Sequence, residues 1–123
     1  MPKPLAFVVE DDPLLNNVFS LTLQPDYEIR SVADGERAIQ ELTQASPALI
    51  VLDMNLPGAS GRDILAYIRT QKRLAQTRII VATADALQAD SLEDQVDLVL
   101  LKPVSPNQLR ALTARIMKTK KIL

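Results

Sequence analysis

Short apolar runs alternate with segments of helical periodicity along the whole chain, and this alternation is what most constrains its fold. The runs of strand length lie at residues 5–10, 27–33, 48–53, 78–83 and 96–101. The segments in which apolar residues recur every three or four positions lie at residues 12–24, 34–45, 60–71, 85–95 and 105–118. Strands that alternate with helices predict βαβ crossovers, and therefore an α/β fold with a parallel sheet.

The polarity of the predicted strands indicates how the helices are arranged around them. The runs at 48–53 and 78–83 are almost entirely apolar, as expected when helices cover both faces of a sheet. The run at 27–33 is the most polar, so we predict that it lies at an edge. Asp12 with Pro13 and Ser105 with Pro106 are good helix starts, because a side-chain oxygen at the N-cap and a proline at the next position both favour initiation. The length fits one domain, 1–123.

The composition excludes several kinds of chemistry. The chain has no histidine and no cysteine, which removes histidine general bases, Ser-His-Asp triads, disulfides and zinc sites built from these residues. Its net charge of −1 gives no indication of nucleic-acid or membrane binding. No apolar run approaches the length of a membrane span, and we therefore expect a cytoplasmic protein.

Polar residues follow four of the five predicted strands at their carboxyl ends. In chain order they are Glu10, Asp11, Asp12, Asp53, Asn55, Thr83, Asp85, Lys102 and Pro103. Ligands of open α/β sheets bind at this rim. Carboxylates that meet there repel one another unless a cation neutralises them, and Mg²⁺ fits because it takes one or two carboxylates and leaves room for a phosphate. The Thr83 hydroxyl and the Lys102 ammonium are suited to hold phosphoryl oxygens.

Each of these residues also has an ordinary structural explanation when it is taken alone. Asp12 is a helix cap, Thr83 is a good strand residue, and Lys102 is a possible surface lysine. Short motifs of this kind match by chance. The combination of an acid pair, an acid, a hydroxyl and a Lys-Pro at the ends of four strands is much harder to assign to chance.

With these residues the chain resembles the receiver domain of two-component response regulators from about Leu5 to Met117. The stretches that carry the resemblance are "FVVEDDPLL", "LIVLDMNLPGASG", "IIVATA" and "LLKPVSPNQL". The resemblance implies a flavodoxin-like (βα)5 fold, a doubly wound five-stranded parallel sheet in strand order 2-1-3-4-5. It also implies a Mg²⁺-dependent phosphoacceptor in a phosphorelay that acts as a signalling module and not as a metabolic enzyme, with no site for an organic cofactor.

The resemblance also implies a role for each residue of the rim. Asp53 would be the phosphorylated aspartate, with Thr83 and Lys102 holding the phosphoryl group. The metal ligands would be Asp11, Asp53, the backbone carbonyl of Asn55 and, mostly through a water molecule, Glu10. Lys102 would pair with Asp53, and the Lys102–Pro103 peptide bond would be cis. Since the chain has no histidine, the phosphoryl group would come from a histidine kinase, a histidine phosphotransfer protein or a small phosphodonor.

The sequence departs from the family pattern in two ways. Val99 occupies the position, three before Lys102, at which the family usually has an aromatic residue whose rotation is coupled to the threonine. The segment between Thr83 and Lys102 is also shorter than usual, so we predict a truncated or irregular fourth helix. That segment carries five acids and no basic residue, whereas the end of the fifth helix carries Arg115, Lys118, Lys120 and Lys121. The fourth helix, fifth strand and fifth helix are the predicted binding surface for a downstream protein, although a solvated charged surface is a slightly better explanation of these charges.

A further hypothesis concerns the lifetime of the phosphorylated state. Asn55 and Asp85 lie two positions beyond Asp53 and Thr83, and in the resemblance these positions flank the path of the hydrolytic water. Two short polar side chains there would orient that water and shorten the lifetime.

Three other functions compete with the phosphoacceptor. One is a pseudo-receiver that binds partners constitutively, which Val99 keeps open. Another is a phosphohydrolase of the haloacid dehalogenase type, which needs a second aspartate where this chain has Asn55. The last is a flavin- or nucleotide-binding domain, which needs a glycine-rich loop after the first strand, where this chain has the acidic "EDDPLL".

Overall fold

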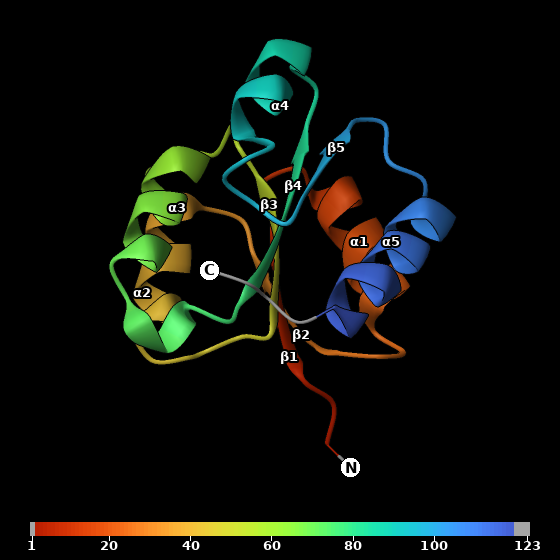
Figure 1. Cartoon of the computed structure of the whole chain (residues 1–123), viewed down its shortest axis with the longest axis horizontal. Helices are drawn as coiled ribbons and strands as arrows, with labels where there is room; N and C mark the ends of the chain where they lie inside the picture. Colours follow the sequence, from red (N-terminus) through yellow and green to blue (C-terminus); the bar gives the residue numbers. More distant parts are fainter. Residues whose placement is uncertain (1, 120–123) are drawn as a thin grey trace.

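The computed structural model describes residues 2–119, in which five parallel strands form a sheet between two layers of helices (Figure 1). The strands are β1 (Leu5–Val9), β2 (Glu28–Val32), β3 (Leu49–Asp53), β4 (Arg78–Thr83) and β5 (Leu98–Leu101). Their order is β2-β1-β3-β4-β5, and every neighbouring pair is parallel. The predicted doubly wound sheet is therefore confirmed, as is the edge position of β2.

The helices follow the predicted segments but are shorter at their ends. They are α1 (Pro13–Leu23), α2 (Gly35–Leu42), α3 (Gly61–Arg69), α4 (Ala86–Leu92) and α5 (Pro106–Lys118). A short 3₁₀ turn, Lys72–Leu74, lies before β4 and was not predicted. The fourth helix has only seven residues, which confirms the truncation expected from the short segment before Lys102. No helix of the described residues is long and apolar enough to cross a membrane.

Hydrogen bonds that capping side chains accept explain where the five α-helices begin. Asp12, Asp34, Ser60, Asp85 and Ser105 occupy the five N-cap positions, and each side chain accepts a hydrogen bond from a backbone N–H of the first turn. These donors have no partner within their own helix, so the caps satisfy groups that would otherwise be left unpaired. The predicted starts at Asp12 and Ser105 are thus confirmed.

The sheet has a separate hydrophobic core on each of its two faces. Helices α2, α3 and α4 cover one face, where Phe7, Ile50 and Leu92 are fully buried. Helices α1 and α5 cover the other face, around Phe19 and Leu109. Figure 1 shows the two layers on opposite sides of the sheet. Because both faces are covered, the central strands bring apolar side chains to both, and only their ends carry polar groups.

Helix α1 leaves two of its large apolar residues exposed and buries a polar one. Leu14 and Leu21 remain 71% and 58% exposed, whereas Asn16, Phe19 and Leu23 are buried. The large Phe19 ring enters the core, and Asn16 is buried because its amide bonds to backbone carbonyl groups of the sheet. Burial of a hydrogen-bonded amide costs little, so polarity alone misplaces this face.

A glycine lets the start of α2 approach the loop that follows β3. The Gly35 N–H donates to the Pro57 carbonyl at 3.0 Å. A Cβ atom at position 35 would lie 1.7 Å from the Ala59 carbonyl oxygen, so a side chain cannot fit there. In the same loop Gly58 has a φ of 76°, which favours glycine. This contact positions the loop that leads away from Asp53.

Candidate functional site

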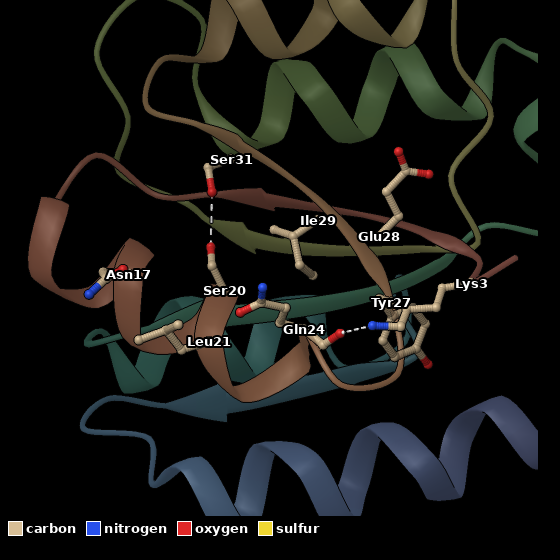
Figure 2. A pocket seen from close by; sticks show the side chains of 9 residues that line it. All are labelled: Lys3, Asn17, Ser20, Leu21, Gln24, Tyr27, Glu28, Ile29 and Ser31. Carbon is tan, nitrogen blue, oxygen red and sulfur yellow. Dashed lines mark hydrogen bonds between the residues drawn. The ribbon is translucent and has the colours of Figure 1, made fainter.

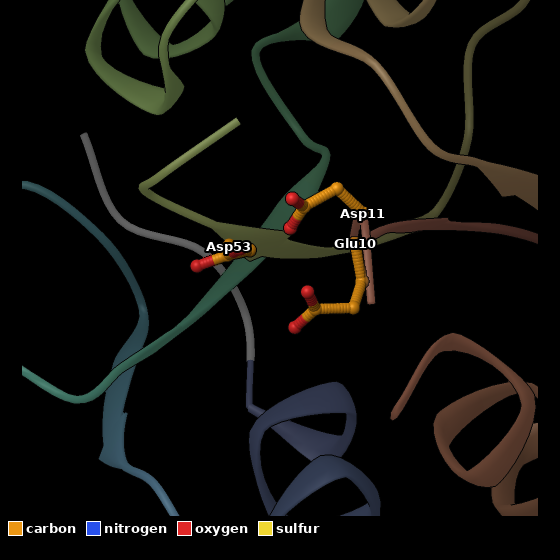
Figure 3. A group of neighbouring side chains, drawn as sticks. All are labelled: Glu10, Asp11 and Asp53. Atoms are coloured by element: carbon orange, nitrogen blue, oxygen red, sulfur yellow. The ribbon is translucent and has the colours of Figure 1, made fainter. Parts of the chain in front are cut away.

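Three acidic side chains meet where the neighbouring strands β1 and β3 end. One carboxylate oxygen from each of Glu10, Asp11 and Asp53 lies within 4.8 Å of the others (Figure 3). The pairing of Val9 with Leu52 sets this register, because it brings the ends of both strands to the same level. Glu10 and Asp53 are 2% and 6% exposed, whereas Asp11 faces solvent. The predicted acidic cluster is therefore assembled at the rim, with one open side.

Lys102 enters the acidic cluster from the end of β5. Its Nζ lies 2.7 Å from Glu10 Oε1 and 3.4 Å from Asp53 Oδ1. Burial by itself would lower the pKa of Lys102, but the hydrogen bond and charge of Glu10, together with Asp53, raise that pKa above its usual value. The ammonium group thus stays charged between two buried carboxylates. The Lys102–Pro103 peptide bond that follows is cis.

The surroundings of Glu10 raise the pKa of its carboxyl group. Burial raises its pKa and outweighs the opposing hydrogen bonds from Lys102 and from the Asp12 N–H. The charge of Asp53 raises the pKa further. Charge at this rim is therefore only partly neutralised by Lys102, and a divalent cation would complete the neutralisation.

The donor set at the rim fits Mg²⁺. The three acids offer oxygen ligands close enough to share one cation, and the exposed side of Asp11 leaves space for water molecules. Asn55 is exposed, and its N–H donates to Asp53 Oδ1 at 3.3 Å. Glu10 is also engaged by Lys102, so Asp11 and Asp53 would be the carboxylates most free to hold such a cation.

Thr83 ends β4, beside Asp53. It is 1% exposed, and the register that pairs Asp53 with Ala82 puts it one position beyond the acid on the neighbouring strand. Its hydroxyl donates to Gln88 Oε1 at 2.9 Å and accepts from the Asp85 N–H at 3.1 Å. The Asp85 carboxylate caps α4 by accepting from the N–H groups of Leu87 and Gln88. Asp85 was predicted as a residue that tunes dephosphorylation; in the structure it caps α4.

Val99 lies in β5 opposite Val81 and is half-buried. It packs against the core under α2, α3 and α4. Leu101, at the end of the same strand, and Leu87, in α4, are 52% and 82% exposed, although both are large apolar residues. The position that usually carries an aromatic ring is thus filled by a small residue packed on the core.

Sequence reasoning missed two polar residues that contact the site. One is Gln88, the partner of Thr83; the other is the buried Asn16 of α1. Asn16 Nδ2 donates to the carbonyl oxygens of Glu10 at 2.9 Å, Val32 at 3.3 Å and Val8 at 3.4 Å. The only signal in the sequence is an amide side chain one turn before Phe19, on the face that the helix buries.

The same network continues to the edge strand β2. Ser20 donates to Asn16 Oδ1 at 3.2 Å, and the hydroxyl groups of Ser20 and Ser31 lie 2.9 Å apart (Figure 2). Figure 2 shows these serines lining a hollow between α1 and β2, where the Lys3 ammonium donates to the Gln24 carbonyl. The bonds of Asn16 and Ser20 fix α1 against the end of β1, which carries the acidic pair, and against β2.

Comparison with known proteins gives consistent matches. Residues 6–114 match the response regulator receiver domain family. The chain is 34% identical over 124 residues to the phosphate regulon transcriptional regulatory protein PhoB of Klebsiella pneumoniae, which covers 96% of this chain and 53% of that protein. It is 29% identical over 121 residues to the sensor histidine kinase TmoS of Ectopseudomonas mendocina, which covers 96% of this chain and 12% of that protein. The chain thus spans about half of the first of these relatives and a small part of the second.

A solved structure agrees with these matches. The receiver domain of the sensor histidine kinase PA1611 from Pseudomonas aeruginosa PAO1, with a magnesium ion coordinated in its active-site cleft, superposes with a TM-score of 0.85 at 28% identity. The match covers 95% of this chain and 99% of that domain. Related domains therefore occur both in sensor histidine kinases and in transcriptional regulatory proteins. The family match across most of the chain, the strand order and the acidic rim together show that this chain belongs to the response regulator receiver domains of two-component systems.

Proposed function

We propose that the chain is a single receiver domain that accepts a phosphoryl group on Asp53. The observation that carries the proposal is the position of this carboxylate. It is almost buried at the end of β3, with Glu10 and Asp11 on one side and the Lys102 ammonium 3.4 Å away. A carboxylate of this kind is a competent nucleophile toward phosphorus.

The reaction forms one bond and breaks another. A carboxylate oxygen of Asp53 attacks phosphorus and forms an acyl phosphate, while the bond from phosphorus to the donor nitrogen or oxygen breaks. When bound by the acidic cluster, Mg²⁺ supplies neutralisation of the charge that spreads over the transferred oxygens. Lys102 then turns from Glu10 and Asp53 toward a phosphoryl oxygen, and the Thr83 hydroxyl donates a hydrogen bond to another. A chain without histidine takes its phosphoryl group from a histidine kinase or a histidine phosphotransfer protein.

The proposed output surface consists of α4, β5 and α5. It exposes the apolar residues Leu87 and Leu101, and the acids Glu93 and Asp94 are exposed at the end of α4. Arg115 and Lys118, in the last turn of α5, are exposed as well, whereas Lys120 and Lys121 lie outside the described residues. Apolar residues bordered by charges of both signs suit a protein target whose affinity changes with phosphorylation. Amide hydrogen exchange that changes on these elements when Asp53 is occupied would support this surface.

Intact mass measurement after incubation with Mg²⁺ and acetyl phosphate tests the proposed function. We expect the parent to gain one phosphoryl group, and the Asp53→Ala variant and a parent sample with EDTA to gain none. Beryllofluoride, in which beryllium and fluorine stand for phosphorus and its oxygens, should bind the parent in the presence of Mg²⁺. A folded parent that neither gains mass nor binds beryllofluoride would contradict the proposal and favour a constitutive binding module.

A further inference from the structure

The hydroxyl group of Thr83 has its single proton committed to a side chain of α4. Thr83 Oγ1 donates to Gln88 Oε1 at 2.9 Å, and its oxygen accepts from the Asp85 N–H at 3.1 Å. Thr83 is 1% exposed, so a change of partner for this hydroxyl has to happen within the site. Since a hydroxyl has one proton to donate, Thr83 cannot serve Gln88 and a phosphoryl oxygen at the same time.

The backbone of Gln88 is hydrogen-bonded within α4, and through Ser91 this network reaches α3. Its N–H donates to the Asp85 cap at 3.2 Å, and its carbonyl accepts from Ser91 Oγ at 2.8 Å. The Ser91 hydroxyl accepts from Arg62 Nη2 of α3 at 3.1 Å. A continuous series of hydrogen bonds therefore leads from the end of β4 through α4 to α3.

We propose that Gln88 is a positioning residue, which holds the Thr83 hydroxyl proton in the unphosphorylated state and releases it when a phosphoryl group occupies Asp53. Through this exchange, Gln88 transmits the occupancy of Asp53 to α4. The inference rests on the proposed function and deepens it. The small side chain of Val99 offers no ring that can move between two packed positions, so the hydrogen bond provides the coupling.

Helix α4 is suited to respond to the loss of one contact. It has seven residues, of which only Ala89 and Leu92 are buried. A helix of this length has little stability of its own, so its position depends on its contacts with the rest of the domain. When the Thr83 hydroxyl leaves Gln88, the first turn of α4 loses the hydrogen bond that joins it to the end of β4. Leu87 lies in that same turn and is 82% exposed, so the change reaches the proposed output surface.

Removal of the Gln88 acceptor should favour the state in which a phosphoryl group or beryllofluoride occupies Asp53. In Gln88→Leu the Thr83 proton has no competing partner in the resting protein, so beryllofluoride should bind about two- to tenfold more tightly in the presence of Mg²⁺, the range that one net hydrogen bond gives. Gln88→Met should behave in the same way and serves as a second variant. Gln108→Leu alters an exposed glutamine of α5 and is the matched control, with unchanged affinity expected.

A double-mutant cycle with Thr83→Val separates the coupling from a general change in α4. We expect Gln88→Leu to have no effect on beryllofluoride affinity when Thr83 is already valine. Hydrogen exchange of residues 86–92 gives the second measurement. In the parent it should accelerate when beryllofluoride and Mg²⁺ are added, whereas in Gln88→Leu it should be fast from the start and change little.

Two results would overturn the inference while the proposed function stands: a parent that binds beryllofluoride with the same affinity as Gln88→Leu and Gln88→Met, or an effect of Gln88→Leu that persists in the Thr83→Val background. A folded parent that binds no beryllofluoride would instead overturn the proposed function, and the inference with it.

Discussion

Lys102 lies closer to Glu10 than to the proposed phosphoacceptor: its Nζ is 2.7 Å from Glu10 Oε1 and 3.4 Å from Asp53 Oδ1. The resemblance to receiver domains implies a pair between Lys102 and Asp53, and the structure adds Glu10 as the nearer partner. The ammonium group is thus shared by two buried carboxylates. Because the shorter contact of Lys102 is to Glu10, the Asp53 carboxylate is held less closely by the ammonium group.

Replacement of Lys102 should therefore affect stability as well as phosphorylation. In Lys102→Met the nearly buried Glu10 loses its cationic partner, and we expect the free energy of unfolding to fall by about 2 kcal/mol in the absence of metal. Glu10→Gln in the same chain should recover part of the loss, because the unpaired buried charge is then gone. Urea denaturation of the parent, both single variants and the double variant measures this. A loss in Lys102→Met that Glu10→Gln does not reduce would argue against the shared ion pair.

Magnesium should stabilise the domain through the acidic cluster. At a concentration about 100 times the dissociation constant, binding to the folded state alone adds about 2.7 kcal/mol, which corresponds to a rise of several degrees in melting temperature. In Asp11→Asn, the same stabilisation should need at least a tenfold higher Mg²⁺ concentration, which corresponds to about 1.4 kcal/mol of binding free energy. Asp90→Asn, which alters an exposed acid of α4, is the matched control and should keep the full response. Thermal scans over a series of Mg²⁺ concentrations check the prediction.

The pH dependence of stability should reveal the raised pKa of Glu10. Burial raises this pKa above the ordinary value of 4.5, so the folded protein binds the proton more readily than the unfolded chain does. The contribution of Glu10 is therefore most favourable at low pH and is lost as the pH rises through the raised pKa. We expect the stability difference between the Glu10→Gln variant and the metal-free parent to grow in favour of the variant from pH 4.5 upward. Urea denaturation at several pH values measures the difference, and a constant difference would contradict it.

The lifetime of phosphorylated Asp53 should depend on Asn55 and Asp85. If these side chains orient the hydrolytic water, Asn55→Met combined with a change at Asp85 should prolong the phosphorylated state roughly tenfold, less than a positioned general base contributes. Asp85 also caps α4, so Asp85→Ser is preferable to Asp85→Ala because serine keeps the cap. Decay of the phosphorylated mass after removal of acetyl phosphate gives the rate. An unchanged rate in the double variant would rule the idea out.

Replacement of the buried Asn16 should destabilise the domain, whereas replacement of the exposed Asn17 should not. Asn16→Leu removes the donor to the carbonyl groups of Glu10, Val32 and Val8, and we expect a loss of about 2 kcal/mol in the free energy of unfolding. Since this donor fixes the turn that carries the acidic pair, Mg²⁺ binding should weaken too. Asn17→Leu, on the exposed side of the same helix, should change stability by no more than about 0.5 kcal/mol. Equal effects of the two substitutions would contradict this account.

The sequence predicted the strands, the helices and the acidic rim because these depend on local patterns. The apolar run of residues 48–53 and its end at Asp53 are visible without any knowledge of distant residues, and so are the caps at Asp12 and Ser105. Parallel strands then bring their ends to one edge, so Glu10, Asp11 and Asp53 could be placed together in advance. The ends of the helices were overestimated, because no glycine directly follows the last turn of α2, α3 or α4 to mark where the helix stops. The face that α1 buries could not be predicted, since polarity does not show that the Asn16 amide finds carbonyl partners inside the protein.

The sequence alone thus determined the fold class, which polar residues follow each strand at the rim, and the absence of an aromatic ring at Val99. Only the tertiary structure decided which partner each polar side chain takes. Lys102 and Glu10 are 92 positions apart, and their bond requires the ends of β1 and β5 to lie on one rim with both side chains turned toward each other. The bond between Thr83 and Gln88 likewise depends on where the first turn of α4 lies relative to β4. Such choices are set by distances and directions in three dimensions, which a periodic pattern of residues does not contain.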